Sequence, residues 1–163
     1  MTQEEKDLLL KDLSARLYYG VKMDCHVHYF GDKIERAEII GLKRNLMAEV
    51  KCESYESYNV SLEDYYTKIY LRPMSSMTEE EAFEMFRTVF HQVSLIGVDI
   101  ESDRFRFKMV DSDGHFAGHT ILFFDKIYSL EQSDWLLSHH FDYRGLIERG
   151  LALEAPEGMY KTE

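Results

Sequence analysis

Residues 134–160 read DWLLSHHFDYRGLIERGLALEAPEGMY, a segment with the single Trp of the chain, two adjacent His residues and two glycines placed to end helices. Upstream, Ser129 and Gln132 have the spacing of a capping box, which predicts a helix over residues 130–140. Asp142 is placed to cap a second short helix over residues 143–149, which Gly150 would end. The segment therefore predicts helix, corner, helix and tail. Its apolar residues are too numerous to leave in water, so we expect them in the core: Trp135, Leu136, Leu137, Phe141, Leu146, Ile147 and Leu151.

Two short helices at an angle also occur in helix-turn-helix DNA readers, whose second helix needs basic residues for phosphate contact. Here that helix has two Arg against one Glu, and the chain has a formal net charge of −11. We therefore expect a packing corner and no direct nucleic-acid binding. The candidate contacts for a protein partner at this corner are His139, His140, Tyr143 and Arg144.

The composition is that of an ordered globular protein: 163 residues, 45% of them hydrophobic and 13% aromatic. The sequence contains no run of 18 apolar residues, so no membrane association is expected. The N-terminal residues lack the layout of a secretory signal, which favours a cytoplasmic location. In that reducing compartment Cys25 and Cys52 are expected to be free, buried thiols.

In the first half, Thr2 and Glu5 form a capping box, and leucines at helical spacing predict a helix over residues 3–17. Alternation over residues 21–29 predicts a strand with Met23 and Cys25 on one face. Residues 37–42 and 46–51 follow as strands of a small antiparallel meander. Residues 54–61 are expected to be a polar connection, and Ser61 to cap a short helix ahead of Pro73.

In the second half, Thr78 and Glu81 form another capping box, and an aromatic stripe at helical spacing predicts a buried helix over residues 79–96. Residues 104–109 alternate and residues 120–124 form an apolar run, which together predict a second hairpin with Asp113 and Gly114 in its turn region. Arg72 is placed to pair with the acidic residues 79–81. The fold class predicted is α+β, a small antiparallel meander and a second hairpin packed with amphipathic helices. Residues 1–163 would form a single domain, or two packed lobes divided near residues 71–78.

Three stretches carry a family resemblance: KDLSARLYYGVK (11–22), YLRPMSSMTEEE (70–81) and DWLLSHHFDYRGLIERGLALEAPEGMY (134–160). Together they resemble a family of short uncharacterised proteins encoded by gut Bacteroidales and by their phages and mobile elements. One departure is the Tyr18-Tyr19 pair, where the family pattern has a proline before the tyrosine. The resemblance implies a mobile-element or gut-commensal setting, and it carries over no activity.

The sharpest motif for chemistry is Asp24, His26 and His28, which alternation places on one face of a strand. Amidohydrolases use such an Asp-x-His-x-His pattern to hold a metal, but their barrel needs about 250 residues. A regular helix cannot direct two adjacent His residues at one ion, which weakens the pair at residues 139–140. His115 and His119 flank the hairpin turn near acidic residues that lack the ligand set of a calcium loop, so we expect solvated loop histidines.

The sequence contains no phosphate-cradling glycine loop and no nucleophile elbow. No catalytic residue and no cofactor are therefore predicted. The function favoured is a non-enzymatic interaction or accessory protein of a mobile element or gut commensal, with a protein partner that the sequence does not identify. Two alternatives stay open: a metal-dependent hydrolase that uses Asp24, His26 and His28, and an acidic nucleic-acid mimic that inhibits a basic host enzyme.

Overall fold

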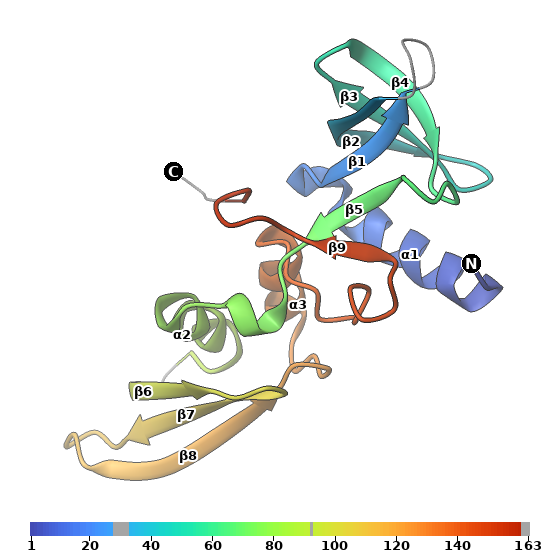
Figure 1. Cartoon of the computed structure of the whole chain (residues 1–163). Coiled ribbons are helices and arrows are strands. Elements are labelled where there is room, and N and C mark those ends of the chain that lie inside the picture. The colour runs from blue at the N-terminus through green and yellow to red at the C-terminus, as the bar shows by residue number, and fades with distance from the viewer. Residues whose placement is uncertain (28–32, 92, 161–163) are drawn as a thin grey trace. The chain divides into compact units, whose positions relative to one another are not determined.

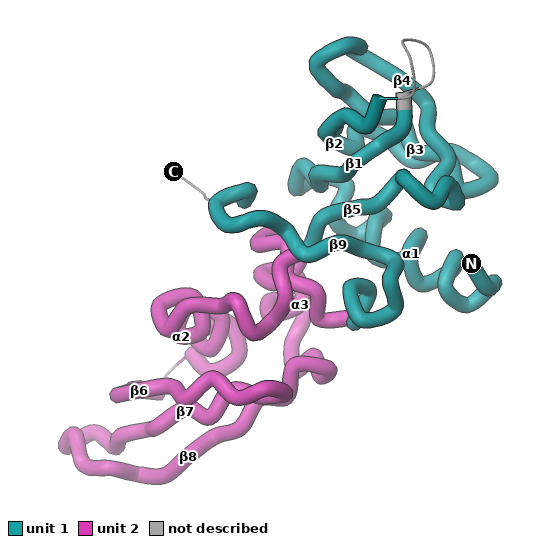
Figure 2. The backbone as a smooth tube through the Cα atoms, viewed as in Figure 1, with its two compact units in different colours: residues 1–71, 145–163 teal, residues 72–144 magenta. Residues whose placement is uncertain are grey.

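The computed structural model describes residues 1–27, 33–91 and 93–160. The chain divides into two compact units (Figure 2): residues 1–71 and 145–163 form unit 1, and residues 72–144 form unit 2. The chain therefore leaves unit 1 once and returns to it near its C-terminal end. Helices occur together with largely antiparallel sheets, so the prediction of an α+β fold is confirmed.

Unit 1 contains a six-stranded sheet (Figure 1) in the order β4-β3-β2-β1-β5-β9. The first four strands form an antiparallel meander, β5 pairs antiparallel with β1, and β9 pairs parallel with β5. The strands are β1 (Lys22–Val27), β2 (Lys33–Lys43), β3 (Met47–Cys52), β4 (Tyr55–Ser61), β5 (Lys68–Leu71) and β9 (Ala152–Glu154).

The three predicted strands of the meander are confirmed as β1, β2 and β3, although β2 begins at Lys33 and not at residue 37. Residues 28 and 29 of the first predicted strand lie outside the described residues. Two predictions after these strands are wrong. Residues 54–61 are not a connection, because they contain β4, whose Val60 is buried in the core. No helix follows Ser61, since turns lead directly into β5 and the Ser61 hydroxyl accepts a hydrogen bond from the Glu63 N–H (3.2 Å). Pairing with β3 decides the conformation of this stretch, and its polar composition does not show that pairing.

Helix α1 (Gln3–Arg16) buries Leu9 and Leu13 in the core of unit 1, together with the inward residues of the meander. It begins with the predicted capping box between Thr2 and Glu5. A fully buried ion pair joins Arg16 Nε to Asp12 Oδ2 at 2.6 Å. The spacing i, i+4 places both groups on one side of the helix, so each compensates the buried charge of the other.

Unit 2 contains a three-stranded antiparallel sheet, β6-β7-β8, and two helices (Figure 1). The predicted hairpin is confirmed as β7 and β8 with its turn at Asp113 and Gly114, and β6 adds a third strand. The elements are the 3-10 turn η3 (Met74–Ser76), α2 (Glu79–Val89), β6 (Ser94–Ile100), β7 (Arg104–Val110), β8 (Phe116–Phe123) and α3 (Leu130–Ser138).

Helix α2 begins at its predicted cap but ends seven residues earlier than the predicted residue 96, so that boundary is wrong. The residues after it pair with β7, where Val98 lies opposite Phe107 and both are buried. The predicted aromatic stripe is confirmed as core at Phe86, whose ring centroid lies 4.4 Å from that of Phe107. Strand pairing outweighs helical periodicity over residues 94–100.

The segment from residue 134 onward contributes to the core of both units, which confirms its predicted burial: all seven apolar residues are buried or half-buried. Helix α3 is confirmed with its N-cap at Ser129. The predicted second helix over residues 143–149 is wrong, because these residues form turns. Gly145 and Gly150 both have positive φ (69° and 68°), which bends the chain where a helix was expected.

Candidate functional site

The face of the unit 1 sheet that is turned away from the core carries a cluster of polar and aromatic side chains. On β1, Lys22, Asp24 and His26 belong to this face, because the alternating Met23 and Cys25 are in the core. This is the alternation that the sequence predicts. The candidate metal-binding strand therefore presents Asp24 and His26 on the outer face of the sheet.

Asp24 is held by groups from neighbouring strands. Its Oδ2 accepts a hydrogen bond from the Tyr70 hydroxyl at 2.7 Å. Arg36 lies opposite Asp24 on β2, and its guanidinium lies 5.2 Å from the centroid of the Tyr70 ring. Burial, and then the hydrogen bond to Asp24, raise the pKa of Tyr70. Asp24 thus has a structural partner in the sheet itself.

His26 borders two tyrosines from the loop between β4 and β5. Its ring centroid lies 5.3 Å from that of Tyr66, and the Tyr66 and Tyr65 rings meet edge to face at 5.3 Å and 88°. Tyr65 is 81% exposed and Tyr66 51% exposed. We call His26, Tyr65 and Tyr66 the tyrosine patch.

The loop that carries the two tyrosines is fixed at both ends and internally. Leu62 and Thr67, which flank the exposed part, are buried. The Asp64 N–H donates to the Ser61 carbonyl (3.2 Å), the Tyr66 N–H to Asp64 Oδ1 (3.0 Å) and the Thr67 N–H to the Asp64 carbonyl (3.1 Å). These bonds form consecutive turns with an Asx turn at Asp64. The backbone that presents the tyrosine patch is therefore held by hydrogen bonds within the loop itself.

The predicted metal site at Asp24, His26 and His28 is incomplete in the described structure, because His28 lies outside the described residues. Asp24 accepts a hydrogen bond from Tyr70, and His26 packs beside Tyr66. Metal binding at this motif stays a prediction.

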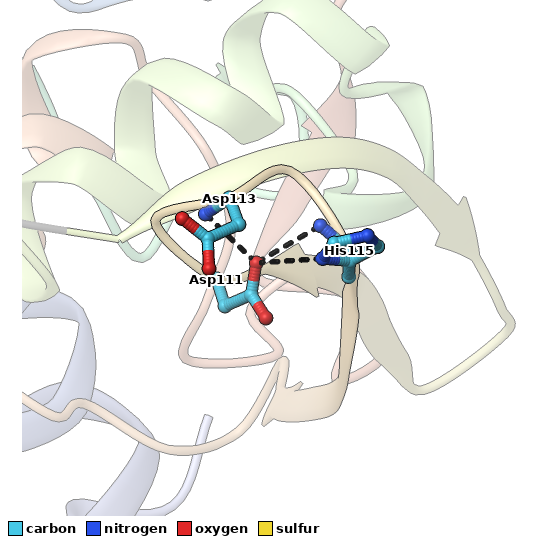
Figure 3. Close-up of side chains that lie close together, drawn as sticks. All are labelled: Asp111, Asp113 and His115. Atoms are coloured by element: carbon cyan, nitrogen blue, oxygen red, sulfur yellow. Dashed lines mark hydrogen bonds and ion pairs between the residues drawn. The ribbon is translucent and has the colours of Figure 1, made fainter.

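Over residues 1–27, 33–91 and 93–160, one group of three metal-ligating side chains comes together: Asp111, Asp113 and His115 (Figure 3). All three are exposed at the β7–β8 turn. Asp111 Oδ1 accepts the backbone N–H of Asp113 (3.0 Å) and of His115 (2.9 Å). The cluster is thus an Asx turn that closes the hairpin. His115 is exposed next to the turn, as predicted for a loop histidine. His119 is also exposed, but it lies within β8, so its assignment to a loop is wrong.

The candidate contacts at the corner after α3 divide into buried and half-buried side chains. His140 and Tyr143 are buried. His139 stacks on Trp135 with ring centroids 4.0 Å apart, and its Nδ1 lies 2.9 Å from the Trp135 carbonyl oxygen. The Arg144 guanidinium lies 4.9 Å from the Tyr143 ring centroid. His139 and Arg144 therefore keep part of their surface accessible, whereas His140 and Tyr143 mainly pack.

Arg72 joins α2 to the residues after α3, within unit 2. Its guanidinium makes two hydrogen bonds to the Glu81 carboxylate (2.7 and 2.8 Å) and lies 4.1 Å from the Phe141 ring centroid. Burial opposes ionisation of Glu81, but hydrogen bonds from Arg72 and from the Thr78 backbone outweigh it and lower the Glu81 pKa. The predicted pairing of Arg72 with the acidic helix start is confirmed.

The sequence prediction missed the two exposed tyrosines, because it assigned Tyr65 and Tyr66 to a helix after Ser61. One signal was available. In a strand with one packed face, adjacent side chains point to opposite faces, so one of two adjacent aromatic residues is left on the exposed face.

Comparison of the chain with protein-family models, with curated proteins and with solved structures gives no match. None of the described helices is long and apolar enough to cross a membrane. The geometry of the tyrosine patch is accordingly the observation from which a function can be proposed.

Proposed function

We propose that this chain is a non-enzymatic interaction protein that binds a protein partner through the tyrosine patch of unit 1. The observation that carries the proposal is the ordered loop after β4, which holds Tyr65 and Tyr66 in water on a hydrogen-bonded turn. An ordered backbone that presents exposed aromatic rings matches what binding surfaces require.

The energetic argument concerns both rings. Tyrosine has a large amphipathic surface and few rotatable bonds, so its burial at an interface stabilises a complex at a small cost in conformational entropy. Aromatic residues account for much of the binding energy at many interfaces. Because hydrogen bonds fix the loop before binding, the partner does not have to order it.

The charge of the chain indicates the chemistry of the partner. The formal net charge is −11, and the loop itself contributes Glu63 and Asp64 next to the tyrosines. Glu63 forms an ion pair with Lys6 (2.5 Å), which balances its charge, and Asp64 leaves the loop with a net negative charge. We expect the partner to offer an apolar or cationic pocket for the rings and a basic rim around it. The family resemblance supports an accessory role in a mobile element or a gut commensal.

The test compares the wild-type chain, the double variant Tyr65→Ala/Tyr66→Ala and the control variant Tyr18→Ala as baits in an extract. Tyr18 also belongs to unit 1 and is 92% exposed, but it lies in the 3-10 turn η1 (Leu17–Tyr19) and not in the loop after β4. The captured protein is then purified and titrated against each bait. We expect the double variant to lose roughly tenfold or more in affinity and Tyr18→Ala to lose none.

Equal affinity of the double variant and the wild type would exclude the tyrosine patch as the binding surface. Turnover of a small substrate by the purified chain, abolished by a single substitution, would contradict the non-enzymatic part of the proposal.

A further inference from the structure

Strand β8 is an edge of the three-stranded sheet, and its backbone groups alternate between β7 and the open side. The Phe124 N–H, just after β8, donates to the Asp103 carbonyl beside β7 (3.0 Å), whereas the Phe123 N–H donates to the Tyr128 hydroxyl (3.2 Å). Even-numbered residues near this end therefore face β7, and odd-numbered residues face away. It follows that His119 and Ile121 direct their N–H and C=O groups to the open side of β8.

The sequence of β8, FAGHTILF, lacks the charged residues and prolines by which proteins usually protect a strand edge. Its pairing with β7 shifts register between Met109 and Val110, but the pairs from Gly118 to Phe123 are regular. The strand contains no Asp, Glu, Lys, Arg or Pro over eight residues. Two of its large apolar side chains are exposed, Phe116 at 59% and Ile121 at 38%. A long, uncharged and apolar edge strand is a template for pairing with another strand.

The other edges of the two sheets are protected, within the described residues. Strand β6 carries Asp99 and a register shift between Leu95 and Gly97. Strand β4 carries Glu56, and its pairing with β3 has a register shift near Cys52. Strand β9 has only three residues. Because β8 also has a register shift, charge and length are what single it out as the edge that is open to pairing.

We propose that β8 pairs antiparallel with β8 of a second copy of this chain, about a two-fold axis at Thr120. In this register His119 exchanges both backbone hydrogen bonds with Ile121 of the second copy, and Ile121 does so with His119 of that copy. Pairing ends before Phe123, whose N–H is already bonded to Tyr128. The three-stranded sheet of each copy thereby becomes half of one continuous sheet.

The absence of charged residues from β8 favours a second copy as the occupant, because pairing with an identical strand brings no like charges together. Two chains of net charge −11 repel each other wherever acidic surfaces meet, so self-association requires a locally neutral surface. The β8 strand is uncharged. The basic side chains of the neighbouring strand are balanced by acidic ones, since Lys108 pairs with Asp99 (3.1 Å) and Arg106 with Glu101 (2.8 Å). No charged side chains oppose each other between the two β8 strands.

The oligomeric state of the full chain tests the proposal by sedimentation equilibrium over a range of concentrations. We expect a dimer for the wild type and a dissociation constant raised at least about tenfold for Ile121→Lys, which introduces charge at the junction. The control Ile96→Lys places the same charge at an exposed position of the protected edge strand β6 and should leave the dimer intact. Ile121→Pro removes only an outward N–H, so it should also dissociate the dimer without disturbing the pairing with β7. Circular dichroism verifies that each variant is folded.

A cross-link tests the register. Thr120→Cys brings two thiols together at the axis in a non-hydrogen-bonded pair and should form a disulfide-linked dimer on mild oxidation. Ala117→Cys, exposed on the same strand but away from the axis, should not. A wild-type chain that is monomeric at about 100 μM, or a dimer that both Ile121 variants leave unchanged, would overturn the proposal.

Discussion

Replacement of Tyr160 by Phe removes one hydroxyl that connects three parts of unit 1. Strands β1 and β5 pair at Met23 with Ile69 and at Asp24 with Lys68. At the next position the Tyr160 hydroxyl bridges the two strands in place of a direct hydrogen bond. It accepts a hydrogen bond from the Lys22 N–H (2.9 Å) and donates one to the Tyr70 carbonyl (2.9 Å). The side chain of the C-terminal segment therefore completes the hydrogen bonding between two central strands.

The expected loss in free energy of unfolding follows from the two backbone groups, the Lys22 N–H and the Tyr70 carbonyl, that lose their partner in Tyr160→Phe. An unsatisfied buried donor or acceptor costs about 1 to 3 kcal/mol. Because Tyr160 is only half-buried, water can partly replace the lost hydroxyl. The cost for each of the two groups is therefore near the lower end of that range. We expect the free energy of unfolding to fall by about 2 to 3 kcal/mol. This is a large share of the stability of a typical domain.

The same hydroxyl predicts a dependence on pH. Burial raises the pKa of Tyr160 from 10.0 to about 12. A group whose pKa is raised in the folded state stabilises the fold below its unfolded pKa and loses that contribution as the pH rises through the folded pKa. The window is thus pH 10 to 12, and a shift of about two units corresponds to at most about 3 kcal/mol. Tyr160→Phe should abolish this part of the alkaline destabilisation.

The assay is urea unfolding followed by far-ultraviolet circular dichroism, together with hydrogen exchange at the Lys22 amide. Tyr18→Phe is the matched control, because the Tyr18 side chain lies almost entirely in water and should leave both measurements unchanged. An unchanged urea midpoint for Tyr160→Phe, with the Lys22 amide as slow to exchange as in the wild type, would refute the reasoning.

Three further predictions concern other parts of the chain. Trp135→Ala should lower the free energy of unfolding by about 3 to 5 kcal/mol because the ring is buried, whereas Leu130→Ala on the exposed side of α3 should have almost no effect; circular dichroism during urea unfolding measures both. Glu81→Gln should lower the free energy of unfolding by about 1 to 3 kcal/mol, because it removes the charge that pairs with Arg72 and weakens the cap of α2. An equal loss for the control Glu84→Gln on the same helix would contradict this role. Cys25, whose thiol pKa burial raises to about 11, should resist alkylation at pH 8 in the folded chain and react rapidly in urea, as mass spectrometry of the peptide would show.

Helix starts were predictable because the atoms that determine them are close in sequence. The capping boxes at Thr2 and Thr78 fix the first residues of α1 and α2, since each cap is completed by a glutamate three residues later. The end of α2 was not predictable in this way. The residues after α2 fit both a helical and an extended pattern. Pairing of β6 with β7 decides between the two, and that partner strand lies beyond the residues that carry the helical pattern.

The candidate sites show the same division between local and distant causes. Alternation placed Asp24 and His26 on the outer face of β1, as the structure confirms. What Asp24 does there depends on Tyr70, a residue 46 positions away that no local pattern connects to it. The tyrosine patch likewise depends on whether residues 62–67 form turns or a helix, and the burial of Leu62 and Thr67 at the two ends of the loop is a tertiary fact.

The segment after α3 shows how a correct local signal can accompany a wrong element. Gly150 was predicted to end a helix in the left-handed conformation, and its φ of 68° confirms that conformation. The Leu151 N–H donates to the Leu146 carbonyl (2.9 Å) and the Gly150 N–H to the Ile147 carbonyl (2.9 Å), which is the bonding pattern of a helix C-terminus. Gly145, also left-handed, stands immediately before this turn, so a single turn can form but a helix over residues 143–149 cannot. Two left-handed glycines five residues apart therefore indicate an isolated turn, and this turn places Leu146 and Leu151 in the core of unit 1.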